Sequence, residues 1–146
     1  MKVKSYAKLN LTLNVSGVKN GFHDIDSLVT SVDIYDVVNV DTRNDGRINV
    51  EKLKGIRNER NAAYKAADAF IRRFGSFGVD VVIDKGIPFG AGMGGSSADA
   101  AAVIYCMCKL FDIEENSDEV QNICAEVGSD VSFMLRGGFG RMRGKG

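Results

Sequence analysis

The sequence has no tryptophan, one histidine, one proline and three cysteines among its 146 residues. It has no apolar run of about 18 residues, the length that a membrane-spanning helix needs, and its first residues contain no signal-peptide core. The cysteines, Cys106, Cys108 and Cys124, are too few and too close together for a disulfide framework. These absences argue against a membrane protein and a secreted disulfide scaffold, and they favour buried thiols in a reducing cytoplasm.

An excess of charge of one sign is also missing, because 19 basic and 19 acidic residues cancel. A net charge of zero provides no general attraction to a nucleic-acid backbone or an anionic membrane surface. The 45% of hydrophobic residues can build a core, and the length suits one domain better than two. We therefore expect one folded domain without a nucleic-acid or membrane partner.

The first half of the chain has the pattern of β-strands. Residues 3–15 alternate between apolar and polar, which predicts one strand with Ala7, Leu9 and Leu11 toward the core. A turn is expected over residues 15–22, with Asn20-Gly21 as its strongest signal. Further strands are expected at residues 27–34, 36–42 and 47–51, as an antiparallel meander, and at residues 78–84.

The second half has the pattern of helices. Apolar residues recur at helical spacing between Asn61 and Gly75, which predicts a helix that the glycine ends. The stretch ADAAAVIYCMCKLF is apolar nearly all round and predicts a buried helix. Asn116 and Glu119 form a capping-box pattern before a third helix.

A glycine-rich segment, KGIPFGAGMGGSS, stands directly before the buried helix. Glycines let backbone N–H groups approach an anion closely, and a helix N-terminus adds its dipole and unpaired donors. Ser96 and Ser97 can offer hydroxyls to a phosphate or to Mg²⁺. The segment predicts a phosphate site, and a turn that only packs a helix is the alternative.

Two common phosphate loops fit this segment poorly. A Walker A loop needs a lysine after its glycines, and none follows here. The string GAGMGG matches G-x-G-x-x-G, but a dinucleotide site needs those glycines straight after a strand, and residues 85–89 intervene. The stretch after the buried helix, residues 111–116, is also short, acidic and unlike a strand.

Phosphoryl transfer needs a cation and often an acid that accepts the proton of the nucleophile. Lys8 is the candidate cation, on the same strand face as Asn10, about 7 Å along; a solvated strand face is the alternative. Asp130, after Gly128-Ser129, is the candidate base, and a simple helix cap is the alternative. A lysine beside that aspartate would stabilise a developing alkoxide.

Two further polar residues have weaker signals. His23, the one histidine, could stack on or hydrogen-bond to a ring, and a surface turn is the alternative. Asp99 lies inside the buried helix, where we expect it to interact with the helix dipole or cap the helix rather than bind a metal.

Five stretches in order resemble the GHMP kinase superfamily, and together they span nearly the whole chain. AKLNLTLNV resembles its opening strand, NGFHDIDSLV its Gly-aromatic-His signature and NAAYKAA its first-helix signature. IPFGAGMGGSSADAAA is similar to its ATP loop, and GSDVSFML to its late segment around a catalytic acid.

The resemblance implies an α+β fold like the second domain of ribosomal protein S5, with helices packed on a mostly antiparallel sheet. It implies ATP-dependent phosphorylation of a small molecule with Mg²⁺. The opening strand and Phe22-His23 resemble the corresponding segments of the members that phosphorylate the 2-hydroxyl of a cytidine diphosphate-linked methylerythritol. A homoserine or mevalonate type of GHMP kinase, and a non-catalytic binding module on the same fold, are the alternatives.

Residue roles follow from the resemblance by position. Asp130 falls on the catalytic acid, Lys8 on the catalytic lysine, and Asn10 beside the reacting hydroxyl. Phe22 and His23 fall where the family holds cytosine. The expected ATP-binding residues are Asn61, Pro88, Phe89, Gly90, Ala91, Gly92, Met93, Gly94, Gly95, Ser96, Ser97 and Ala98. Relatives continue into a ferredoxin-like domain, so we expect residues 1–146 to be the N-terminal, ATP-binding domain of a longer protein.

Overall fold

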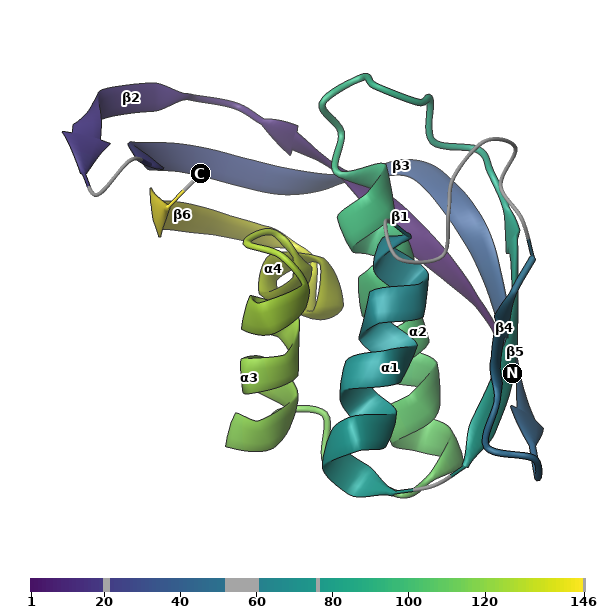
Figure 1. Cartoon of the computed structure of the whole chain (residues 1–146). Helices are drawn as coiled ribbons and strands as arrows, with labels where there is room; N and C mark the ends of the chain where they lie inside the picture. The colour runs from purple at the N-terminus through teal and green to yellow at the C-terminus, as the bar shows by residue number, and fades with distance from the viewer. Residues whose placement is uncertain (20–21, 52–60, 76, 146) are drawn as a thin grey trace.

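A computed structural model describes residues 1–19, 22–51, 61–75 and 77–145 of the chain (Figure 1). The elements in chain order are β1 (Lys2–Asn10), β2 (Asn14–Lys19), β3 (Phe22–Arg43), β4 (Ile48–Val50), α1 (Ala62–Phe74), β5 (Gly78–Asp84), α2 (Gly95–Leu110), α3 (Asp118–Val127), α4 (Val131–Arg136) and β6 (Phe139–Lys145). The described residues form a mixed sheet with helices packed on it, which confirms the expected α+β class.

The long strand β3 is the centre of the sheet. β1 and β2 pair with successive parts of one edge of β3, and β5 and β6 pair with the other edge, all antiparallel. The strands expected at 27–34 and 36–42 are therefore one strand, because no glycine or proline interrupts the chain between them. The expected meander is also wrong at β4, which pairs parallel to β5.

The first predicted strand is wrong beyond Asn10. β1 ends there, the chain bends, and β2 begins at Asn14, inside the stretch expected as a turn; Asn20-Gly21 lie outside the described residues. Ala7 is buried as expected, but Leu9 and Leu11 are 46% and 54% exposed. The alternation breaks because Ala7 and Lys8 are both buried, next to a register shift between Tyr6 and Ala7 in the pairing of β1 with β3.

The helices lie together on one side of the curved sheet, with α1 and α2 side by side (Figure 1). α1 begins after Asn61, whose side chain accepts a hydrogen bond from the Ala63 N–H at 2.9 Å, and it ends at Gly75 as predicted. The cap of α3 is Ser117 rather than the expected Asn116. None of the helices in the described part of the chain is both long and apolar enough to cross a membrane.

The hydrophobic core lies between the sheet and the helices, and α2 runs through it. As predicted, α2 is buried along most of its length, including Cys106 and Cys108. The largest side chains with less than 2% exposure include Ile104 and Met107 of α2 itself, together with Phe70, Val38, Val40, Val79 and Val81. This packing fixes the start of α2, and with it the segment that enters the helix, relative to β1 and β3.

Candidate active site

The glycine loop, residues 85–94, joins β5 to the start of α2. Gly90, Gly92 and Gly94 have φ angles of +70°, +71° and +72°, a left-handed conformation that residues with a side chain adopt at a cost. A Cβ at Gly90 or Gly92 would meet no atom within 4 Å. The loop therefore presents open backbone to its surroundings, as a phosphate-binding loop requires.

The start of α2 has no side-chain cap. Its N-cap is Gly94, which has no side chain of its own, and no side chain among the described residues caps the first turn. The N–H groups at this end, which include those of Ser96 and Ser97, precede the first backbone bond of the helix, from the Ala98 N–H to the Gly94 carbonyl. An uncapped helix N-terminus behind a glycine loop is suited to binding a phosphate group.

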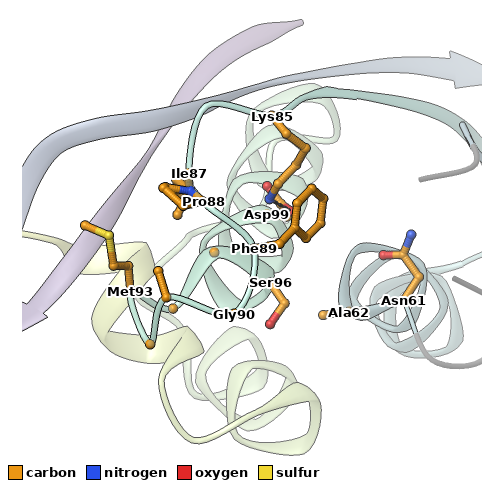
Figure 2. A pocket seen from close by; sticks show the side chains of 14 residues that line it. Asn61, Ala62, Lys85, Ile87, Pro88, Phe89, Gly90, Met93, Ser96 and Asp99 are labelled. Carbon is orange, nitrogen blue, oxygen red and sulfur yellow. Dashed lines mark hydrogen bonds and ion pairs between the residues drawn. The ribbon is translucent and has the colours of Figure 1, made fainter. Parts of the chain in front are cut away.

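A cavity of about 350 Å³ lies between this loop and the start of α1. Figure 2 shows Phe89, Lys85 and Asp99 grouped on one side and Asn61 across from them on α1. The cavity is lined by Asn61, Ala62, Lys85, residues 87–96 and Asp99. Phe89 is 70% exposed, so its ring is available to cover a bound molecule.

Lys8 and Asp130 meet beside the loop. Lys8 Nζ lies 3.3 Å from Asp130 Oδ2 and donates a hydrogen bond to Asn10 Oδ1 at 2.8 Å. Lys8 is only 8% exposed. Asp130 occupies the N-cap position of α4 but makes no capping bond, so the simple capping alternative does not describe it.

The loop is attached directly to Lys8. The Lys8 N–H donates to the Met93 carbonyl at 3.0 Å. A Cβ at Gly94 would lie 2.3 Å from Met134 Cε, the end of a flexible side chain, and 3.1 Å from Lys8 Cγ, so the contact with Lys8 and the backbone conformation favour glycine there. The structure thus brings the predicted cation, the predicted base and the predicted phosphate loop to one place.

A buried charge cluster lies under the loop, and we did not predict it from the sequence. Lys85 Nζ donates hydrogen bonds to Asp36 Oδ2 and, at 2.8 Å, to Asp99 Oδ2. Burial raises the pKa of Asp99 to about 7, although Lys85 opposes the shift. The expectation that Asp99 serves the helix dipole or cap is wrong, because its charged partner is Lys85. The one available signal was Lys85, a lysine directly before the glycine segment.

The remaining predicted residues are placed as follows. Asn10 is next to Lys8, and Asn61 both caps α1 and lines the cavity. The backbone of Phe22 and His23 begins β3, opposite Lys19 and Val18, and their side chains are outside the described part of the structure. The described residues contain no group of three or more His, Cys, Asp or Glu that could hold a metal ion.

Comparison with known proteins gives one consistent family. Residues 61–138 match the family described as GHMP kinases N terminal domain. The whole chain is 36% identical to the 4-diphosphocytidyl-2-C-methyl-D-erythritol kinase of Clostridium beijerinckii, of which the match covers 53%. The chain spans about half the length of the curated relatives it matches.

Solved structures agree with that match. A crystal structure of 4-(cytidine 5'-diphospho)-2C-methyl-D-erythritol kinase is similar with a TM-score of 0.85 and 31% identity, over 99% of this chain and 52% of that chain. A crystal structure of mevalonate kinase has a TM-score of 0.74 at 14% identity, over 100% of this chain and 55% of that chain. The second likeness concerns the fold alone.

Proposed function

This chain belongs to the GHMP kinase family, and from that premise we propose that it is the nucleotide-binding part of a 4-diphosphocytidyl-2-C-methyl-D-erythritol kinase. Such an enzyme transfers the γ-phosphoryl group of ATP to the 2-hydroxyl of its substrate in the non-mevalonate route to isoprenoids. The observation that carries the proposal is the Lys8–Asp130 pair, 3.3 Å apart and in contact with the end of the glycine loop. A base, a cation and backbone donors for phosphate are the groups that this chemistry needs.

ATP binding is assigned to the glycine loop and the first turn of α2. The open glycines and the uncapped helix start suit a polyphosphate, and the cavity beside them accepts the rest of the nucleotide, with Asn61 on its far wall. Ser96 and Ser97 are the hydroxyls nearest to that end of the helix. Because Mg²⁺ is usually held by one or two protein oxygens and by phosphates, these hydroxyls fit an ion that arrives with ATP and neutralises phosphate charge.

Lys8 and Asp130 have distinct parts in the proposed step. Asp130 accepts the proton of the 2-hydroxyl, whose oxygen forms a bond to the γ-phosphorus while the bond from that phosphorus to the departing ADP oxygen breaks. Lys8 stabilises the negative charge that develops on the attacking oxygen. Asn10 holds the Lys8 ammonium at 2.8 Å and lies beside the proposed position of the accepting hydroxyl.

The acceptor is assigned to the cytidine diphosphate-linked methylerythritol. The sequence likeness to kinases of that name, which extends over the whole chain, supports this choice over a mevalonate or homoserine acceptor. Phe22 and His23, at the β2–β3 hairpin, are assigned to cytosine. We also propose that the protein works in the cytoplasm, which the three free, buried cysteines support.

Calorimetric titration and an assay of ADP release test the proposal. The chain should bind ATP with Mg²⁺, and EDTA should weaken that binding. ADP release should require the cytidine diphosphate-linked acceptor, and neither mevalonate nor homoserine should replace it; the assay uses the chain alone and joined to the remaining half of a relative. ADP release with mevalonate or homoserine would assign a different acceptor to the enzyme. A folded chain that does not bind ATP would overturn the proposal.

A further inference from the structure

We propose that Asp36, which does not line the cavity, is a positioning residue that sets the conformation of the glycine loop for nucleotide binding. The inference rests on the proposed function, because ATP is the ligand that the loop would bind. The buried Asp36 carboxylate contacts the residues that begin the loop, and Lys85 connects it to Asp99 in the helix that follows the loop.

Asp36 is fully buried on β3 and accepts three hydrogen bonds from one neighbouring segment. Its Oδ1 accepts from the N–H groups of Gly86 and Ile87 at 2.7 Å each, and its Oδ2 accepts from Lys85 Nζ. The three donors are consecutive residues at the beginning of the glycine loop. One side chain therefore determines both the position and the direction in which the chain leaves β5.

The beginning of the loop lies directly against β3. A Cβ at Gly86 would be 2.3 Å from the Tyr35 carbonyl oxygen, so only glycine permits this approach. The close contact places the Gly86 N–H where Asp36 can accept from it. The contact and the carboxylate thus act on the same point of the chain.

Lys85 extends the attachment to the far end of the loop. Its ammonium contacts Asp36 on β3 and Asp99 in α2, at 2.8 Å from Asp99 Oδ2. These contacts join the residue that begins the loop to the helix that follows it. Residues 88–94, which carry the open glycines, lie between the two fixed points, and the Lys8 N–H holds Met93 from a third side.

A cluster of this kind is a poor way to gain stability alone. Two buried carboxylates share one ammonium, and taking charges out of water opposes folding unless the geometry is excellent. Backbone N–H groups bind phosphate well only when they are held in place before the ligand arrives. What the cluster provides is therefore a fixed loop, and two of its members, Lys85 and Asp99, line the cavity directly.

The test compares Asp36→Leu and Asp36→Asn with the wild-type chain. Leucine removes every acceptor, whereas asparagine keeps an oxygen for the Gly86 and Ile87 N–H groups and loses the charge and the acceptor that face Lys85. Asp80→Asn is the matched control, because it removes a β5 carboxylate that pairs with Arg43 of β3, outside the cavity lining. The readouts are the dissociation constants of ATP–Mg²⁺ and of the acceptor, and amide hydrogen exchange of residues 86–95.

We expect Asp36→Leu to raise the dissociation constant of ATP–Mg²⁺ by about tenfold or more, because displaced donors bind an anion poorly. Exchange in residues 86–95 should accelerate in the same variant. Asp36→Asn should recover a large part of both properties, and acceptor binding and the Asp80→Asn control should stay near wild type.

A folded Asp36→Leu chain with wild-type ATP affinity and wild-type exchange in the loop overturns the inference. If that variant does not fold, the same two readouts on Asp36→Asn decide. A lower melting temperature with unchanged ATP affinity assigns Asp36 to stability alone and also overturns it. If the wild-type chain binds no ATP, the proposed function fails, and the exchange data alone show whether Asp36 positions the loop.

Discussion

Lys8 and Asp130 face each other across the site, with Nζ and Oδ2 3.3 Å apart, although one residue belongs to the first strand and the other precedes the last helix. Neither is paired as an ordinary surface salt bridge, since Lys8 is buried and also contacts Asn10. Around this pair the chain places the end of the glycine loop. The proposed base, the loop, the cavity wall and the charge cluster can each be tested by a separate substitution.

Replacing the proposed base should separate catalysis from nucleotide binding. Asp130→Asn keeps the size of the side chain and removes its ability to accept a proton, so kcat should fall by about 10²- to 10⁴-fold. ATP affinity should change little, because the phosphate donors are elsewhere. Steady-state kinetics and calorimetry measure the two effects, and Glu126→Gln, on the exposed face of α3, is the control. Loss of ATP binding in Asp130→Asn would instead mark this residue as structural.

A single methyl group at Gly94 should damage the site. Gly94→Ala places a Cβ against Met134 and Lys8 at a φ of +72°, so ATP affinity should fall by roughly tenfold or more. Gly46→Ala is a matched control, because Gly46 has a φ of +69° and nothing within 4 Å of the added Cβ. Both variants should lose about 1 kcal/mol of stability from backbone strain. Equal ATP affinities in the two variants would contradict the close packing of the loop on Lys8.

Asn61 both caps α1 and lines the cavity, and the effects of these two positions can be measured apart. Asn61→Ala removes the cap of α1 and should lower the free energy of unfolding by about 1 kcal/mol. Ser117→Ala removes the corresponding cap of α3, far from the cavity, and should have a similar cost. Only Asn61→Ala should also weaken ATP binding, because Asn61 lines the cavity. Urea unfolding and calorimetry of both variants check this, and equal ATP affinities would remove Asn61 from the nucleotide site.

The buried Asp99 should make stability depend on pH. Its pKa is about 7 in the folded chain and 3.8 ordinarily, so folding takes up a proton between about pH 4 and pH 7. Its contribution to the free energy of unfolding is therefore full below about pH 4. That contribution declines as the pH rises to 7, by at most about 1.4 kcal/mol per pH unit. Wild type minus Asp99→Asn, measured by urea unfolding across this range, should decrease with pH.

Asp26 provides a comparison of opposite sign for that measurement. The Arg141 guanidinium lowers the pKa of Asp26, so the contribution of this carboxylate is present at neutral pH and is lost as the pH falls below about 4. Wild type minus Asp26→Asn should therefore rise with pH in the acid range. A flat difference for Asp99→Asn, alongside a slope for Asp26→Asn, would show that Asp99 is charged in the folded chain.

The parts of the fold with local signals were predictable from sequence. The capping asparagine and terminal glycine identify α1, and the apolar stretch after the glycines identifies α2. The pairing of β6 with β3 and the parallel pairing of β4 depend on contacts distant in the chain, which local patterns do not report. The exposure of Leu9 has the same cause, because strict alternation assumes an unbroken strand, and the register shift beside Ala7 depends on the pairing with β3.

The residues of the candidate site also divide into those that the sequence reveals and those that only the fold reveals. The glycine segment, Lys8 and Asp130 were visible because their residue types suit phosphoryl transfer and because they resemble the motifs of a known family. Asp36 and Lys85 were not, since each looks ordinary until the fold brings them together. Only a three-dimensional arrangement shows that one ammonium connects β3 to α2.

The antiparallel pairing of β3 with both early and late segments has a consequence for biosynthesis. Lys8 leaves the ribosome long before Asp130, and β6 must still add to the edge of β3 after that. Contacts between distant segments form slowly, because closing a large loop has an entropic cost. Lys8 and Asp36 are already present when the glycine loop emerges, whereas the Lys8–Asp130 pair can form only after residue 130 has been made, so the proposed base is the last part of the site to arrive.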